Sequence, residues 1–199
     1  IESPKGGEMI SSGSSCNIQW NATPEAVSFD LFYSLDNGVS WPLIKKDERN
    51  TIYSWTVPKT IGNKKACFVR VIGYDGTRTK KIGSDTSKAF TIEVVTLITP
   101  NGGGEPLHAG DPFTIEWRGC PDAVTFDLMV SFDNGLNWRF IDDKDTLGVI
   151  EGKGVTGTTL TTKVPSPGAG NSTTCFIKVI AYNGAGKQIG SDASDKPFT

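Results

Sequence analysis

The sequence has little of what metal and catalytic centres are usually built from. It contains one histidine, His108, in 199 residues, and its four cysteines include no CxxC pair. Because structural zinc sites use closely spaced cysteine and histidine ligands, this pattern argues against zinc. The sequence also lacks an apolar run approaching the roughly 20 residues that span a bilayer. We therefore expect no membrane insertion and no bound cofactor or metal.

The sequence also has no excess of charge of either sign. Its 20 Lys and Arg residues nearly balance 22 Asp and Glu residues, which gives a net charge of −2. Proteins that bind nucleic acid normally show a broad basic face, so nucleic acid is not an expected partner. What the sequence has in abundance is turn residues, with 23 glycines and 11 prolines. This composition favours a β protein with many turns.

Two copies of one unit make up the chain. Matching blocks follow one another in both halves: SPKGGE (3–8) with TPNGGGE (99–105), VSFDLFYSLDNGVSW (27–41) with VTFDLMVSFDNGLNW (124–138), and CFVRVIGYDG (67–76) with CFIKVIAYNG (175–184). This repeat predicts two domains, residues 1–94 and 95–199, each large enough for one small core. The second copy stops early in its closing strand, so we expect the chain to be part of a longer protein.

Apolar and polar residues alternate in several segments of each copy. Cys16, Ile18 and Trp20 recur at every second position, and segment 29–33 shows the same pattern. A period of two is typical of a strand with one buried face. Short strands of this kind between glycine-, proline- and asparagine-rich turns predict an all-β fold of two tandem immunoglobulin-like or fibronectin type III-like β-sandwiches. The second copy is longer at 143–159, where we expect an extra hairpin or a long loop.

The cysteines differ between the copies. Cys16 and Cys67 each open a predicted strand, and in this sandwich topology the two strand starts lie at the same end, so we predict a Cys16–Cys67 disulfide. In the second copy Phe113 takes the place of Cys16, and Cys120 falls near the far end of the strand. Parity favours a Cys120–Cys175 bond, whereas a strand rising about 3.3 Å per residue would hold the two thiols apart. The sequence leaves that pair undecided.

Each copy contains a hairpin motif that resembles the Asp-box, S-x-D-x-G-x-x-W. The matching residues are Ser34, Asp36, Gly38 and Trp41 in the first copy and Ser131, Asp133, Gly135 and Trp138 in the second. An Asn-Gly pair supplies the positive φ angles of a tight turn, and the aspartate can accept backbone N–H bonds across it. Asp-boxes occur in sialidase propellers, but a propeller needs four or more blades. The motif therefore predicts a hairpin rather than a catalytic centre.

A second set of apolar residues lies opposite the core-facing residues of the same strands. The set comprises Phe32, Phe68 and Ile72 in the first copy and Met129, Phe176 and Ile180 in the second. Apolar residues that cluster on an outer sheet face can mark a partner surface. The alternative, which we favour, is that Trp41 or Trp138 folds over them.

The order of these blocks resembles a known family. SP..GG, an IxW strand, VSFDLFYSLDNGVSW, YSWTVP (53–58) and CFVRVIGYD follow one another as in the Kre9/Knh1-like domain of the Ser-Thr-rich, GPI-anchored type. The second copy departs from it, because it reads TLTTKVP (159–165) without the tryptophan. In fungi such domains are associated with cell-wall glucan assembly. The resemblance implies an extracellular, cell-surface or periplasmic location and supplies no catalytic residues.

No set of residues in the sequence supports catalysis. Hydrolysis needs a nucleophile with a base, paired carboxylates in a cleft, or a metal, and His108 has no evident partner. We therefore predict no catalytic, cofactor-binding or metal-binding residues, and conclude that the chain is not an enzyme. The favoured function is a non-catalytic structural or adhesive spacer module of a larger secreted or cell-surface protein. Its partners would be other domains of that protein, or protein or glycan at the cell surface.

Two binding functions are alternatives. Aromatic rings can stack on sugars, which makes a carbohydrate-binding module the first of them. The candidate rings are Trp41, Trp55, Trp138 and Phe140. Calcium is the second, with candidate ligands Asp36, Asp133, Asp142, Asp143 and Asp145. These carboxylates lack the ligand spacing of a calcium loop, so solvated acidic turns are the favoured interpretation. We likewise expect the cations Arg78, Lys80 and Lys81 to belong to a solvated hairpin.

Overall fold

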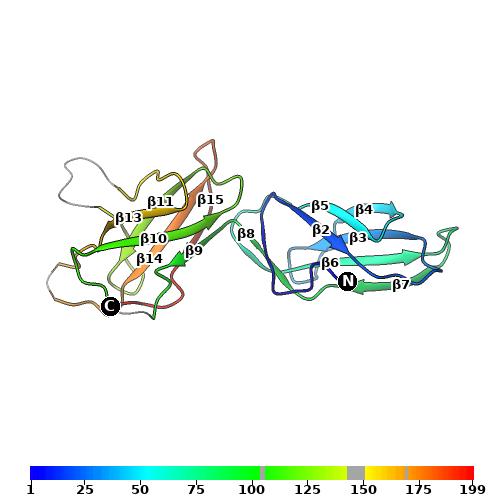
Figure 1. Cartoon of the computed structure of the whole chain (residues 1–199), viewed down its shortest axis with the longest axis horizontal. Helices are drawn as coiled ribbons and strands as arrows, with labels where there is room; N and C mark the ends of the chain where they lie inside the picture. The colour runs from blue at the N-terminus through cyan, green and yellow to red at the C-terminus, as the bar shows by residue number, and fades with distance from the viewer. Residues whose placement is uncertain (104–105, 143–150, 169) are drawn as a thin grey trace. The chain divides into compact units, whose positions relative to one another are not determined.

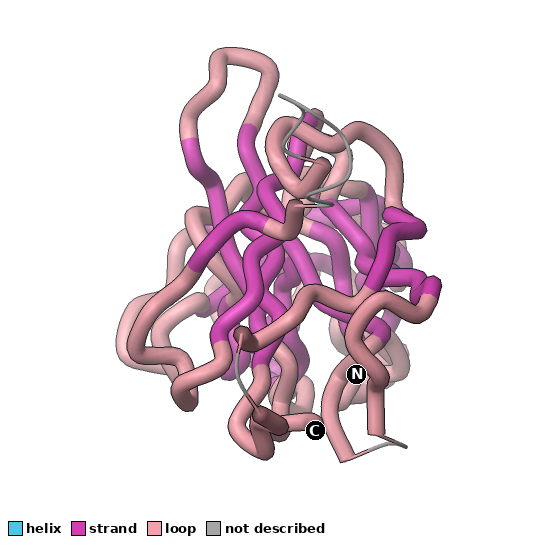
Figure 2. The backbone as a smooth tube through the Cα atoms, turned by 90° about the vertical axis from the view of Figure 1, so that its left-hand side faces the viewer, coloured by secondary structure: helices cyan, strands magenta, loops and turns pink. Residues whose placement is uncertain are grey.

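The computed structural model describes residues 1–103, 106–142, 151–168 and 170–199. Within these ranges every helix or strand element is a strand, as the colouring of Figure 2 shows. The chain divides into two compact units, Ile1–Glu93 and Val94–Thr199 (Figure 1). Each unit contains two sheets, and the predicted fold class of two tandem immunoglobulin- or fibronectin type III-like β-sandwiches is confirmed. None of the described residues forms a helix long and apolar enough to cross a membrane.

The first unit pairs a six-stranded sheet with a two-stranded sheet. Its strands are β1 (Met9–Ser11), β2 (Ser15–Gln19), β3 (Ser28–Ser34), β4 (Leu43–Glu48), β5 (Ile52–Thr56), β6 (Lys64–Tyr74), β7 (Lys81–Thr86) and β8 (Phe90–Glu93). The larger sheet has the order β1-β8-β6-β3-β4, with β7 also paired to β6, while β2 pairs with β5. Inward-facing side chains of both sheets form one core, which includes Trp55 and Phe90.

The second unit repeats this plan with a three-stranded and a four-stranded sheet. Its strands are β9 (Val95–Thr99), β10 (Pro112–Gly119), β11 (Thr125–Ser131), β12 (Arg139–Phe140), β13 (Thr159–Lys163), β14 (Phe176–Tyr182) and β15 (Gln188–Ala193). The sheet orders are β13-β10-β9 and β12-β11-β14-β15. The core of this unit includes Ile115, Leu128 and Ile177, each 0% exposed. In both units the alternating strands therefore bury one face and present the other.

A tryptophan occupies the same place in each core. Trp20 packs edge-on against Phe29 with ring centroids 5.2 Å apart, and Trp117 packs against Phe126 at 5.4 Å. Among the described residues, the indole N–H groups of Trp20 and Trp117 are the buried side-chain polar groups that lack a hydrogen-bond partner. A buried polar group without a partner is unusual, so aromatic packing decides the placement of both rings.

The longer loop predicted at 143–159 falls partly outside the described residues, which omit 143–150. Towards its end, Val155 forms an antiparallel bridge with Phe126 in β11. The backbone N–H of each of these two residues donates to the carbonyl of the other at 2.8 Å. The end of this loop therefore lies along β11, on the sheet that carries the second hairpin motif.

Candidate interaction surface

The two Asp-box-like segments, residues 34–41 and 131–138, form matching loops that we call the DNG hairpins. Each one begins at the last residue of a strand, β3 or β11, and leads to the next strand in the chain. The asparagine and glycine at each tip have positive φ angles between 58° and 82°. Asparagine and glycine adopt this left-handed backbone more readily than other residues.

The Asp36 carboxylate organises the first DNG hairpin. Its Oδ1 accepts the Ser34 hydroxyl at 2.8 Å and the Ser40 N–H at 2.9 Å, and its Oδ2 accepts the Ser40 hydroxyl. These bonds, led by that of the Ser40 hydroxyl, lower the pKa of Asp36 from 3.8 to about 2. The Ser34 hydroxyl in turn accepts the N–H of Gly38 at 2.8 Å. Both carboxylate oxygens are therefore used inside the loop.

The second DNG hairpin has the same arrangement with one change of partner. The Oδ1 of Asp133 accepts the Ser131 hydroxyl at 2.7 Å and the Asn137 N–H at 2.8 Å. The side-chain amide of Asn137 donates to Oδ2 at 2.6 Å, in place of the serine hydroxyl of the first hairpin. The pKa of Asp133 is lowered to about 2, mainly by the Asn137 backbone N–H.

A tryptophan closes each DNG hairpin and carries a cation on its ring. The Nε1 of Trp41 donates to the Gly38 carbonyl at 2.9 Å, and the Arg70 guanidinium carbon lies 3.6 Å from the ring centroid. In the second unit, Lys178 Nζ lies 3.8 Å from the centroid of Trp138. Such contacts are attractive cation–π interactions. Loss of water around Lys178 lowers the pKa of its amine.

The predicted apolar set lies on the outer face of the same sheets. Its six members, all half-buried, are Phe32, Phe68, Ile72, Met129, Phe176 and Ile180. Phe32 lies opposite Arg70 in the β3–β6 register, and Met129 lies opposite Lys178 in the β11–β14 register. The cation on each tryptophan is thus the cross-strand neighbour of an apolar residue of the set. Each unit therefore has an outer-face patch made of these apolar residues, the cation and the tryptophan.

Sequence reasoning missed the most exposed apolar residues of this region. Val39 and Leu136 occupy the same position in the two DNG hairpins and are 84% and 81% exposed. Leu43, opposite Phe32 in β4, is 52% exposed. The available signal was an apolar residue directly after each Asn-Gly turn, where a polar residue would be usual. Val39 and Leu136 therefore add an exposed apolar side chain to each DNG hairpin, and Leu43 adds one beside the outer-face patch of the first unit.

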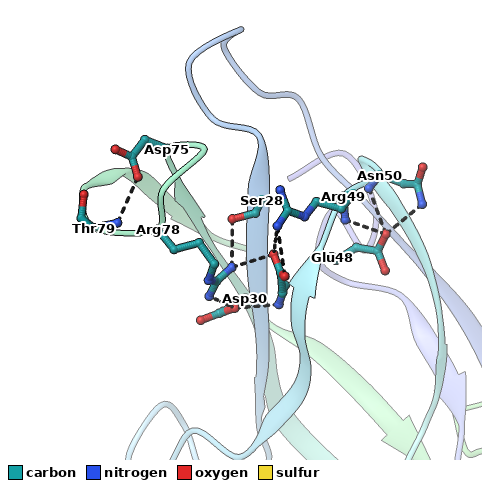
Figure 3. Close-up of polar contacts among 9 residues, drawn as sticks. Ser28, Asp30, Glu48, Arg49, Asn50, Asp75, Arg78 and Thr79 are labelled. Carbon is teal, nitrogen blue, oxygen red and sulfur yellow. Dashed lines mark hydrogen bonds and ion pairs between the residues drawn. The ribbon is translucent and has the colours of Figure 1, made fainter.

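A polar cluster on β3 belongs to the first unit. The Arg78 guanidinium binds Asp30 at 2.6 Å, as Figure 3 shows, and Asp47 at 3.2 Å. It also donates to the Ser28 hydroxyl at 2.9 Å and lies 4.7 Å from the ring centroid of Tyr74. The hydrogen bond to Asp30 raises the pKa of Arg78. With its side chain 22% exposed, Arg78 is not the solvated cation that we expected.

The backbone of this cluster is unusual. Asp47 and Arg78 have φ angles of 55° and 58°, a left-handed conformation that non-glycine residues rarely adopt. In the second unit the position of Arg78 is taken by Gly186, with a φ of 72°. The Asp127 carboxylate there accepts the Gly154 N–H at 2.9 Å, much as Asp30 accepts that of Asp47 in the first unit. The ion pairs therefore distinguish the first unit from the second.

Two of the other sequence candidates can be placed. Trp55 is 4% exposed, with its ring centroid 5.6 Å from that of Tyr33 and 6.5 Å from that of Phe90, so it cannot stack on a sugar. Phe140 is half-buried in β12. Asp143 and Asp145, two of the calcium candidates, lie outside the described residues. Among the residues that the structure does describe, no three His, Cys, Asp or Glu side chains form a metal-binding group.

All four cysteines are free thiols in the structure, so the predicted Cys16–Cys67 disulfide is not formed in it. The two residues lie in different sheets, and each Sγ donates to a nearby carbonyl, Cys16 to that of Asn17 and Cys67 to that of Lys64. Burial raises the pKa of both thiols. Cys120 and Cys175, the undecided pair, are both buried.

Comparison with known proteins assigns no family. No protein-family model and no curated protein matches the chain. Among solved structures it is similar to the fibronectin(III)-like modules of Clostridium thermocellum CbhA, with 16% identity, 100% of this chain and 93% of that chain covered, and a TM-score of 0.33. It is also similar to the chicken CNTN1 FN1-FN3 domains, with 14% identity, 98% of this chain and 66% of that chain covered, and a TM-score of 0.34.

A third similar structure is SGBP-B of the Bacteroides ovatus mixed-linkage glucan utilization locus, in complex with a mixed-linkage heptasaccharide. The identity is 10%, the coverage is 100% of this chain and 46% of that chain, and the TM-score is 0.28. At such values the comparisons assign no ligand or partner. The fold assignment rests on the strands and sheets described above.

Proposed function

We propose that the chain is a non-catalytic structural or adhesive spacer module of a larger secreted or cell-surface protein. The observation that carries this proposal is that, in both units, the polar groups of the repeated motif form hydrogen bonds within their own loop. In each DNG hairpin the serine, the aspartate and the tryptophan N–H bond within the loop. The repeated motif therefore closes a turn over a sheet, which is a structural task.

The outer-face patches provide the adhesive part of the proposal. Each combines half-buried apolar side chains with a tryptophan and a cation, and each adjoins a DNG hairpin whose tip residue, Val39 or Leu136, is almost fully exposed. Tryptophan, phenylalanine, methionine and arginine, which these patches contain, are enriched at protein interfaces, whereas lysine, the cation of the second patch, is not. We assign these patches to contacts with other domains of the parent protein or with a protein at the cell surface.

Replacement in the parent protein tests the spacer function. We expect that two unrelated fibronectin type III domains, substituted for residues 1–199, preserve the activity and surface display of the parent. If the replacement abolishes them, the chain has a binding role. The variant Val39→Asp/Leu136→Asp then tests the hairpin tips, since loss of activity at an unchanged melting temperature would place adhesion there. The control Val27→Asp changes another exposed valine outside the hairpins.

Carbohydrate binding is the second candidate function, and one observation favours it. Trp41 and Trp138 are both partly exposed on an outer sheet face at matching positions. We expect a carbohydrate-binding module to lose its retention on cell-wall glucan in the variant Trp41→Ala/Trp138→Ala. The matched variant Val39→Ala/Leu136→Ala changes the same loops without removing an aromatic ring. Equal retention of both variants and the unchanged protein would rule out these tryptophans as sugar platforms.

A further inference from the structure

The second unit contains an open cavity with a mainly apolar wall at one end of its sandwich. Its volume is about 260 Å³. Apolar side chains on its wall include those of Leu107, Phe113, Val130, Val164, Ile177 and Phe198, and polar residues such as Ser166, Asn171 and Ser172 line it as well. They come from both sheets and from the segments next to them, so the cavity enters the core between the two layers. Phe132, near the start of the second DNG hairpin, also lies on the wall, whereas the members of the outer-face patch of this unit do not.

In the first unit a tryptophan packs next to the corresponding place. Trp55 in β5 lies opposite Cys16 in β2, and Thr162 in β13 lies opposite Phe113 in β10. Because Phe113 occupies the sequence position of Cys16, Thr162 stands where the first unit has Trp55. The hydroxyl of Thr162 donates to Glu151 at 2.6 Å. A small polar side chain thus replaces a large core ring.

The neighbours of the missing ring are the residues that line the cavity. Trp55 packs against both Tyr33 and Phe90. The matching residues of the second unit are Val130 and Phe198, and both are on the cavity wall. Strand register supports the match of Tyr33 with Val130. Tyr33 lies opposite Val69 in the first unit, and Val130 lies opposite Ile177, the residue aligned with Val69, in the second. The cavity therefore lies beside the position that the Trp55 indole fills in the first unit.

The rim of the cavity has lost a hydrogen bond as well. In the first unit the Ser12 hydroxyl accepts the N–H of Thr60 at 2.8 Å and ties the loop after β5 to the end of β1. The aligned residues of the second unit are Ala109 and Pro167, which lack the hydroxyl and the N–H. Both lie on the cavity rim. The second unit therefore cannot close its rim with this bond.

We infer that the second unit binds a small planar aromatic ring of indole size in this cavity. An apolar cavity of about 150 Å³ can hold benzene, so 260 Å³ gives room for a two-ring system. The aliphatic walls favour an apolar guest, and Phe113 and Phe198 offer ring contacts like those that Trp55 makes in the first unit. The ring can belong to a free compound or to a tryptophan side chain of another polypeptide.

Titration of the whole chain with free indole, followed through methyl NMR signals, tests the inference. We expect saturable shifts at Val130, Val164 and Ile177, and unchanged signals at Val69 and Val71 of the first unit. A parallel titration uses N-acetyl-tryptophan amide, which carries the same ring on a peptide backbone. Binding of indole alone identifies a free compound as the guest, whereas binding of both identifies a side chain as a guest that the cavity accepts.

Filling the cavity from within provides the second arm of the experiment. The variant Thr162→Trp restores the side chain of the first unit and is expected to weaken indole binding by at least about tenfold, which is about 1.4 kcal/mol. The matched control Thr161→Trp adds the same ring at an exposed neighbouring position, and its affinity should be unchanged. If Thr162→Trp does not fold, Val130→Phe serves as the filling variant.

Two results would overturn the inference. One is the absence of saturable shifts at the cavity methyl groups with both compounds. The other is undiminished indole binding by a folded filling variant, because binding would then take place elsewhere on the chain.

Discussion

At the scale of single residues, Asp36 and Asp133 show how a charge can serve a fold. Each carboxylate lies at the surface and still receives three hydrogen bonds from its own loop. Charge-assisted bonds of this kind are stronger than bonds between neutral groups, so they favour the ionised form. The two aspartates therefore link the stability of the DNG hairpins to pH.

The lowered pKa values predict where this stabilisation disappears. The folded pKa of about 2 lies below the ordinary value of 3.8. Stability from the ionised carboxylates is thus fully present above 3.8 and is lost as the pH falls through 2. We expect Asp36→Asn/Asp133→Asn to lower the melting temperature at neutral pH, and the difference from the unchanged protein to shrink between pH 3.8 and 2. A constant difference in thermal melts across this range would contradict the assignment.

At the scale of secondary-structure elements, the strands were predictable and their side-chain links were less so. The strand with Ile18 and Trp20 could be predicted because its alternation of apolar and polar residues is a pattern of neighbouring positions in the sequence. The Arg78–Asp30 ion pair joins residues 48 positions apart, so no pattern of neighbouring residues predicts it. The apolar face with Phe32 was predicted from the same alternation, but the stacking of Arg70 on Trp41 depends on strand register.

Adding one methyl group at Gly38 tests whether the DNG hairpin requires a left-handed backbone at this position. Gly38 has a φ of 82°, and a Cβ there would lie 3.6 Å from the nearest atom, in Trp41, so space is sufficient. The backbone conformation alone should make Gly38→Ala destabilising by about 1–2 kcal/mol. Gly83→Ala is the matched control, because an added Cβ meets nothing within 4 Å and the φ is not left-handed. Equal free energies of unfolding for the two variants would show that the turn tolerates another conformation.

At the scale of the whole molecule, the duplication explains what the sequence could and could not reveal. Aligning the copies predicted two sandwiches, since matching strands have matching burial. The cavity of the second unit escaped notice, although its signal was present in the replacement of Trp55 by Thr162. A cavity forms when several substitutions together reduce the side-chain volume of a core, and a substitution at one position does not show whether its neighbours compensate for the lost volume. Comparing the packing of the two copies makes the loss visible.

Each unit should fold when separated from the other. The Glu93 carbonyl accepts the Ser12 N–H at 2.8 Å, and the Val94 carbonyl accepts the Cys120 N–H at 2.7 Å, so a division between 93 and 94 keeps both bonds. We expect cooperative thermal unfolding of the fragments 1–93 and 94–199, measured by circular dichroism. The fragment 98–199 is the control, since it lacks Val95 and Leu97 of the second core and should not unfold cooperatively. Failure of 94–199 to fold would show that the unit needs more of the chain.

The two buried indole N–H groups have a practical consequence. Because Trp20 and Trp117 lie in different cores and lack hydrogen-bond partners among the described residues, the N–H of each can exchange with deuterium only when its own core opens. The deuterium-exchange rates of the two indole proton resonances therefore report separately on the opening of the two cores. Read in one sample of the intact protein, they would time the opening of each half without any label or mutation.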